Sequence, residues 1–361
     1  MRYTQKLAAV CAAALPFALV GCATTPTTET TSDTLKVVAS TTQICDYLTQ
    51  IAQAGITVDK TDAQGKHNTI GDGAVEMDLT CLLAPNASAH EHEMTPQQMK
   101  ALGAADILFI NGVDLEHFLD SAVTTSGFDG EVSVTSGVGE IPGDAFTIDK
   151  GTEAIDVRPW PFVEEGEEAE FSHDPHVWTA PPLAAIQVKN IGHALAKAAP
   201  DKADTFTKAV DAYTQKLADL DAWAKKSLDT VPVEKRTLFT SHDAFGYLAA
   251  AYDITFIGAA LSDFNHQQDA TAEHIQAAAD EVKKSGATVL FAENSNNDKS
   301  ISAIARAAGV TAITDADALY GDSLGPAGSP GETYIGSIVH NVTTLVEAWG
   351  GKPAELPTSL K

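Results

Sequence analysis

Histidine and aspartate residues with metal-binding side chains lie in four short segments of this chain, three of them after predicted strands and one after an acidic loop. The four positions are His90, His176, His242 and Asp322. Imidazole nitrogens and carboxylate oxygens bind divalent transition metals, and in open α/β sheets ligands gather beyond the carboxyl ends of the strands. The four residues are therefore candidate metal ligands. Their spacing alone is a weak signal, because no two lie four residues apart and no H-E-x-x-H motif occurs.

The elements that must position these residues are short predicted strands that alternate with helices. In the first half, strands are predicted at 35–40, 77–83 and 106–111, and helices at 44–54, 95–102 and 182–199. In the second half, strands are predicted at 236–241, 254–257, 288–292 and 310–314, and helices at 244–252, 271–284, 301–308 and 333–349. The alternation predicts an α/β fold of two β/α lobes with mainly parallel central sheets.

One long, rigid helix is expected to join these lobes. Residues 201–230 contain no glycine or proline and keep a helical pattern throughout. At ~1.5 Å per residue such a helix would be about 45 Å long and would link an N-terminal lobe at 35–200 to a C-terminal lobe at 231–355. Residues 59–73 are rich in turn-forming residues and are expected to be a surface excursion, and 143–172 a mobile loop.

The N-terminus predicts export and a lipid anchor. A basic start precedes an apolar run that is too short for a bilayer core, which needs ~20 residues, so residues 1–21 are expected to be a signal peptide. The sequence L-V-G-C that ends at Cys22 resembles the bacterial lipobox, which implies acylation of that cysteine on the outer face of the cell membrane. Residues 22–34 would form a Thr-rich tether. The alternative is an ordinary cleaved signal with an incidental cysteine.

The composition limits the partners that the protein can have. The 361-residue chain is 44% hydrophobic and 20% charged, as is usual for a soluble globular protein. Its formal net charge of -26 gives a field that repels phosphate backbones and attracts cations. Nucleic acid is therefore not an expected partner.

Two of the four cysteines remain once the signal peptide and the acylation site are set aside. In an exported protein Cys45 and Cys81 are expected to form a structural disulfide. A redox or metal role is the alternative, and the lack of a C-x-x-C partner argues against it.

The order and spacing of the four candidate segments resemble the metal-binding lipoproteins of bacterial zinc and manganese ABC importers, across residues 35–350. In that family the first ligand histidine lies in a D-P-H-x-Y-E-P-T-P segment. The matching stretch 88–96 reads S-A-H-E-H-E-M-T-P, which places His90 at the ligand position. It departs from the family by Ser-Ala for Asp-Pro and by His92 for the aromatic residue, so His92 is a possible competing ligand.

The resemblance also implies the other three ligands. D-P-H-V-W matches the second ligand motif and carries His176, and S-H-D-A-F-G-Y carries His242, where other members of the family have Glu. Asp322, in a G-D-S-L turn, matches the carboxylate that completes the ligand set in that family. Three imidazoles and one carboxylate suit Zn²⁺, whereas a second carboxylate would favour Mn²⁺, which is the alternative. The metal would lie in the cleft between the lobes and be delivered to an ABC permease.

Further histidines and one glutamate are predicted to lie near this site. His92 and His173 are expected at its rim, where a solvated position is the alternative for His173. Glu293 is expected either to hold a ligand imidazole from outside or to make a local cap or salt bridge. The remaining histidines, for which no ligand role is expected, are His67, His117, His193, His266, His274 and His340.

Two other functional classes stay open from the sequence. Three histidines and one aspartate can hold a catalytic zinc if one position stays open to water, as in a zinc hydrolase. A metal-bearing surface adhesin would use the same lipid anchor. A non-enzymatic metal carrier is favoured, because four candidate ligands fill a tetrahedral shell and no general base is evident near the motifs.

Overall fold

The computed structural model describes residues 34–52, 55–161, 172–259 and 271–361. The predicted signal peptide and the predicted acylation site Cys22 lie outside these ranges, as does the Glu-rich part of the expected loop at 143–172. Within the described ranges, no helix is both long and apolar enough to cross a membrane.

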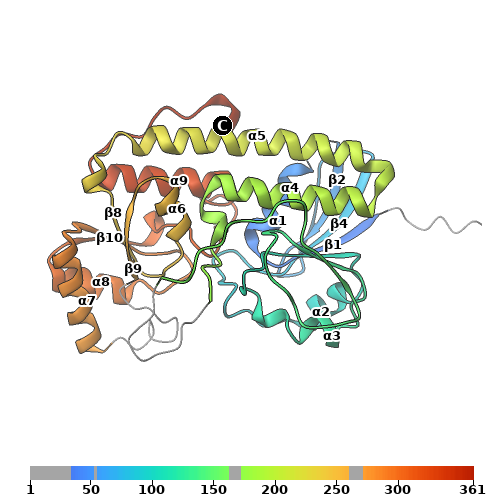
Figure 1. Cartoon of the computed structure of the whole chain (residues 1–361), viewed down its shortest axis with the longest axis horizontal. Coiled ribbons are helices and arrows are strands. Elements are labelled where there is room, and N and C mark those ends of the chain that lie inside the picture. The colour runs from blue at the N-terminus through green and yellow to red at the C-terminus, as the bar shows by residue number, and fades with distance from the viewer. Residues whose placement is uncertain (1–33, 53–54, 162–171, 260–270) are drawn as a thin grey trace, which may run out of the picture. The chain divides into compact units, whose positions relative to one another are not determined.

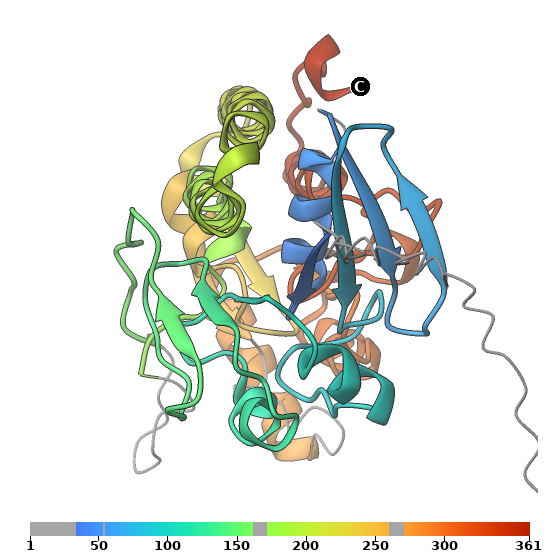
Figure 2. The same cartoon turned by 90° about the vertical axis from the view of Figure 1, so that its right-hand side faces the viewer.

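The first half of the described chain forms a seven-stranded sheet (Figure 2). Its strands run in the order β3-β2-β4-β1-β5-β6-β7. They are β1 (Leu35–Ala39), β2 (Ile56–Thr61), β3 (His67–Ile70), β4 (Val75–Cys81), β5 (Ile107–Ile110), β6 (Glu131–Val134) and β7 (Thr147–Asp149). Neighbours are parallel except for the antiparallel pair of β2 and β3. Every residue of β5 is buried, as expected for a parallel strand covered on both faces.

Two expectations for this half are wrong. Residues 59–73 do not form a simple surface excursion, because they hold the end of β2 and all of β3. The expected loop at 143–172 contains β7, and neither β2 nor β6 was predicted as a strand. Both β3 and β7 are short, exposed edge strands, so they lack the apolar alternation by which a strand is recognised in a sequence.

The second half forms a smaller, wholly parallel sheet in the order β11-β10-β8-β9. Its strands are β8 (Thr237–Thr240), β9 (Thr255–Ala259), β10 (Val289–Phe291) and β11 (Thr311–Ile313). Its helices are α6 (Gly246–Ala251), α7 (Ala272–Ser285), α8 (Lys299–Ala308) and α9 (Tyr334–Ala348). The predicted α/β fold of two lobes with mainly parallel sheets is confirmed.

The predicted long helix is a single unbroken element, α5 (Ala203–Leu228). The helices that precede it are α1 (Thr42–Ile51), α2 (Pro96–Leu102), α3 (Ala122–Thr125) and α4 (Pro181–Ala198). One face of α5, which includes Phe206, Leu217 and Leu220, is buried. Figure 1 shows α5 running above α4 and α9, and it packs against both and against α1. It therefore contacts helices of both halves, while the lobe boundaries proposed from the sequence stay a prediction.

A disulfide fixes the start of α1 to the sheet. Cys45 and Cys81 are bonded, with their Cα atoms 5.6 Å apart. Both cysteines are buried. The bond ties α1 to the carboxyl end of β4, where the loop that carries His90 begins.

Candidate metal centre

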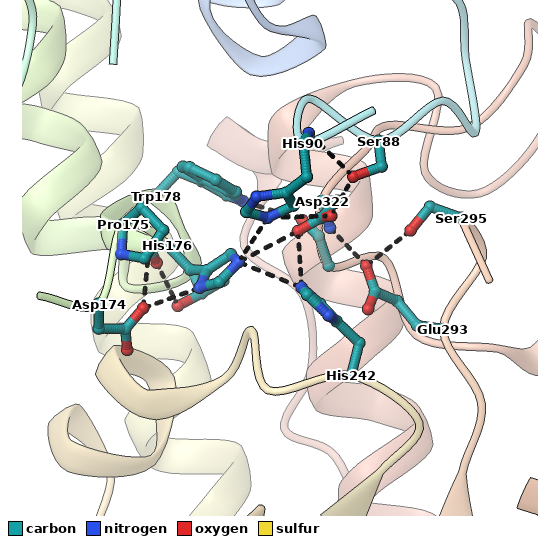
Figure 3. A network of polar contacts seen from close by, with 12 residues as sticks. Ser88, His90, Asp174, Pro175, His176, Trp178, His242, Glu293, Ser295 and Asp322 are labelled. Atoms are coloured by element: carbon teal, nitrogen blue, oxygen red, sulfur yellow. Dashed lines mark hydrogen bonds and ion pairs between the residues drawn. The ribbon is translucent and has the colours of Figure 1, made fainter. Parts of the chain in front are cut away.

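Four loops bring the predicted ligands together (Figure 3). His90 lies between β4 and α2, and His176 immediately precedes the 3-10 helix η2 (Val177–Thr179). His242 is the second residue after β8, and Asp322 lies between β11 and α9. One ligand atom from each of these residues lies within 4.8 Å of all the others. Three of the four loops begin at the carboxyl ends of the parallel strands β4, β8 and β11, as in other open α/β folds, and His176 joins them from the segment before η2.

Four of the six distances between these atoms are close to the edges of a tetrahedron, and all six are within 4.8 Å. His176 Nε2 lies 3.2 Å from His90 Nε2 and 3.2 Å from His242 Nε2. Asp322 Oδ1 lies 3.3 Å from His176 Nε2 and 3.2 Å from His242 Nε2. Bonds of ~2.0–2.1 Å around a tetrahedral Zn²⁺ give edges of about 3.3–3.4 Å. The four side chains can therefore surround one ion with little movement.

Asp174 fixes the ring of His176. Its Oδ1 accepts hydrogen bonds from His176 Nδ1 at 2.8 Å and from the His176 backbone N–H at 3.0 Å. With its proton on Nδ1, a neutral imidazole turns the lone pair of Nε2 toward the other ligands. Side chains from both halves of the chain hold the backbone just before His176. Asn111 donates a hydrogen bond to the Pro175 carbonyl, and Tyr247 donates one to the Asp174 carbonyl.

The electrostatics of the centre favour one positive charge. Burial alone would lower the pKa of His176, but Asp174 and Asp322 raise it to about 10. Burial lowers the pKa of His242 to about 3, helped by the other two imidazoles and opposed by Asp322. Burial would raise the pKa of Asp322, yet His90 and His242 hold it well below its usual range. The centre can thus hold a proton on His176 or a metal cation, and the two compete.

Glu293 supports Asp322 through the backbone. Its Oε1 accepts hydrogen bonds from the Asp322 N–H at 2.5 Å and from Ser295 Oγ at 2.9 Å. Gly321 leaves room for this carboxyl, because a Cβ there would lie 2.3 Å from Glu293 Oε1. The expected contact of Glu293 with a ligand imidazole is not seen among the described residues, where its carboxyl accepts from the Asp322 backbone instead. The carboxylate that holds an imidazole is Asp174.

The first half of the chain also holds the Asp322 turn. Gln43 Nε2 donates to the Asp322 carbonyl at 3.1 Å, and the Leu324 N–H donates to Thr42 Oγ1 at 2.9 Å. Trp178 Nε1 donates to the Gly321 carbonyl at 2.8 Å. The role of Gln43 was not predicted, because nothing local marks a side chain whose partner lies 279 residues away. Asp174 had a signal, its place two residues before His176, and its role as a hydrogen-bond acceptor was not predicted.

The two rim candidates lie apart from the four converging side chains. His92 is half-buried with its ring 4.9 Å from that of Phe118, and burial lowers its pKa. His173 is half-buried with Nδ1 3.0 Å from Ser172 Oγ. His266 lies outside the described residues, and the other histidines do not belong to the group of four that the structure brings together.

Comparison with known proteins identifies the family. A family model described as "Zinc-uptake complex component A periplasmic" matches residues 37–348. The chain belongs to this family. The match covers both sheets and all four candidate ligands, so the resemblance inferred from the ligand segments is confirmed.

Relatives in this family differ in the metal that their names give. The "Zinc-binding protein TroA" of Treponema pallidum is 30% identical over 275 residues, which are 76% of this chain and 82% of that protein. The "Manganese-binding lipoprotein MntA" of Bacillus subtilis is 29% identical over 335 residues, 92% of this chain and 95% of that protein. A solved structure of TroA aligns with a TM-score of 0.67 at 27% identity, over 88% of this chain and 99% of that one.

Proposed function

We propose that this protein captures Zn²⁺ outside the cytoplasmic membrane and delivers it to the permease of an ABC importer. The observation that carries the proposal is the convergence of His90, His176, His242 and Asp322 at distances close to the edges of a tetrahedron. The family supports the transport role, since related members are named as substrate-binding lipoproteins of metal ABC transporters. The protein acts as a carrier in this proposal and catalyses no reaction.

The donor set supports zinc over manganese. Relatives carry names with zinc, manganese and iron, so membership of the family leaves the metal open. Three imidazoles with one carboxylate are typical of zinc, whereas manganese prefers more oxygen donors and a larger shell. Mn²⁺ is the second candidate, because the relative named for manganese, MntA, is 29% identical and the relative named for zinc, TroA, is 30% identical.

Burial of the ligands suggests how the ion is released. His176 and Asp322 are at most 1% exposed, and His242 is 5% exposed. An ion in this centre leaves only if the halves separate, because ligands from both surround it. Separation breaks the hydrogen bonds of Gln43 and Trp178 to the Asp322 turn, and the unbroken α5 that contacts both halves favours a small opening over a wide one.

The lipid anchor is part of the proposal. The lipobox-like sequence that ends at Cys22 and the lipoprotein names of relatives support acylation of this cysteine. The protein would then stay on the outer face of the cell membrane, close to its permease. Labelling cells with a radioactive fatty acid should mark the protein, and Cys22→Ala should abolish the label and release the protein from the membrane fraction.

Metal analysis tests the function. The purified protein, offered Zn²⁺ and Mn²⁺ in equal amounts, should retain one zinc per chain by elemental analysis. His176→Ala removes one donor and should lower zinc affinity at least about 100-fold in calorimetry. His173→Ala is the matched control and should bind like the parent. Equal zinc binding by parent and His176→Ala would refute the site, and a zinc with a bound water and esterase activity would favour the hydrolase.

A further inference from the structure

The two carboxylate oxygens of Asp322 have different surroundings. Oδ1 lies among the imidazoles, 3.2 Å from His242 Nε2 and 3.3 Å from His176 Nε2. It is buried and has no hydrogen-bond partner in the part of the chain that the structure describes. Oδ2 lies 3.5 Å from His90 Nε2 and accepts a hydrogen bond of 2.7 Å from Ser88 Oγ (Figure 3). One oxygen is therefore available to an ion at the centre, and the other is already engaged.

The geometry around Ser88 directs its hydroxyl hydrogen toward Asp322. Ser88 Oγ accepts a hydrogen bond from the His90 backbone N–H at 3.2 Å. That contact occupies a lone pair of the hydroxyl and leaves its hydrogen for the carboxylate. Ser88 belongs to the same loop as His90, whereas Asp322 lies 234 residues further along the chain. This one hydroxyl thus joins the loops of two ligands.

We propose that Ser88 is a specificity-determining residue, which keeps Asp322 a one-oxygen ligand and thereby favours four-coordinate Zn²⁺ over Mn²⁺. The inference rests on the proposed function, since it assumes that the four residues bind a metal. In this role Ser88 affects the choice of metal as well as the shape of the loop that carries His90.

The coordination preferences of the two ions explain the effect. Zn²⁺ is saturated by three imidazoles and one carboxylate oxygen in a tetrahedron, whereas Mn²⁺ favours larger, oxygen-rich shells. A second bond from Asp322 Oδ2 would supply a fifth donor. To make it, Oδ2 has to give up its charge-assisted hydrogen bond from Ser88, and the hydroxyl would be left without its acceptor in a part-buried place. Losing this hydrogen bond therefore weakens the binding of Mn²⁺, which gains from a fifth donor, and leaves the binding of four-coordinate Zn²⁺ unaffected.

Two variants of Ser88 separate its chemistry from its shape. Ser88→Ala removes the hydroxyl, and Ser88→Thr is the matched variant that keeps it. Ser295→Ala is a second control, because Ser295 donates to Glu293 and not to a ligand. The affinities of the purified proteins for Zn²⁺ and for Mn²⁺ are measured by competition with a chelator, and X-ray absorption spectroscopy of the zinc-loaded proteins gives the number of donors.

We expect Ser88→Ala to lower the ratio of zinc affinity to manganese affinity about tenfold, within the range for residues that orient a metal ligand. Its zinc spectrum should show an additional oxygen donor. Ser88→Thr and Ser295→Ala should keep the ratio within about threefold of the parent and keep four donors.

Two results would overturn the inference. Equal weakening of both metals by Ser88→Ala, with four donors retained, would mean that Ser88 only holds the loop, and the proposed function would stand. If the parent protein itself bound neither ion stoichiometrically, the proposed function and this inference would both fail.

Discussion

Two buried carboxyl groups, Asp174 and Glu293, support the candidate ligands in different ways. Asp174 accepts a hydrogen bond from the ring of His176 and, together with Asp322, raises the pKa of that imidazole to about 10 against the effect of burial. Glu293 accepts a hydrogen bond from the backbone N–H of Asp322, and burial raises its own pKa to about 8. The first group therefore acts on a ligand as a charge. The second is largely protonated at neutral pH and acts as a hydrogen-bond acceptor.

The difference shows that a carboxyl beside a metal centre need not contribute charge. Each carboxyl group packs closely against a glycine. A Cβ at Gly246 would lie 2.4 Å from Asp174 Oδ2, and a Cβ at Gly321 would lie 2.3 Å from Glu293 Oε1. The glycines thus leave space for both carboxyl groups. The roles of the two groups differ because one contacts an imidazole ring and the other a backbone N–H. Changes of pH and of charge should separate the two roles.

The largest expected effect is that of pH on zinc affinity. In the metal-free protein the pKa of His176 is raised from 6.5 to about 10, so this residue carries a proton at pH 7. A metal ligand must be neutral, so each zinc ion displaces that proton and affinity rises with pH. We expect zinc affinity to fall about tenfold per pH unit from pH 8 to pH 5, about a thousandfold in all.

Calorimetry in buffers of different ionisation enthalpy measures the displaced proton directly. The observed heat should vary with the buffer by a slope of about one proton per zinc at pH 7. A flat affinity profile with no proton released would show that His176 is neutral before the metal binds, and Asp174 would then have no special effect on it.

The next largest effect is that of Asp174→Asn. The amide oxygen can still accept the hydrogen bond from His176, so the ring stays in place while the negative charge is lost. Zinc affinity at pH 8 should fall about 10-fold to 100-fold, and the slope of affinity against pH should become shallower. Asp120→Asn is a matched control, because Asp120 is exposed and contacts His117, which is not one of the four candidate ligands. Affinity within twofold of the parent in Asp174→Asn would remove the contrast with Glu293.

Elements of the fold that depend on contacts between residues close in the sequence could be predicted, whereas elements that depend on contacts between distant residues could not. Helix α2 was expected at its true position, because its signals are local: Thr95 caps it, Pro96 begins it, and Gln98 completes the capping box. The edge strands β3 and β7 were missed because their stability comes from pairing with neighbours and their sequences are polar or short.

The same distinction applies to the candidate site. Four short segments marked the four side chains that converge, and their resemblance to a family gave them a common role. What positions them could not be predicted, because Gln43, Ser88 and Tyr247 each act on a residue more than 70 positions away. Such contacts depend on how the two sheets face each other, and no local pattern in the sequence encodes that.

The smallest expected effects come from Glu293 and test whether it supplies charge or an acceptor. Glu293→Gln keeps an oxygen for the Asp322 N–H, and at pH 7 it replaces a group that burial already keeps mostly protonated. It should change zinc affinity by less than about threefold. Glu293→Ala leaves the buried N–H of Asp322 without this acceptor, and the turn should lose order, with zinc affinity lower by about tenfold. Competition with a chelator at pH 7 measures both. A tenfold loss in Glu293→Gln would show that Glu293 contributes charge, and the two carboxyl groups would then act alike.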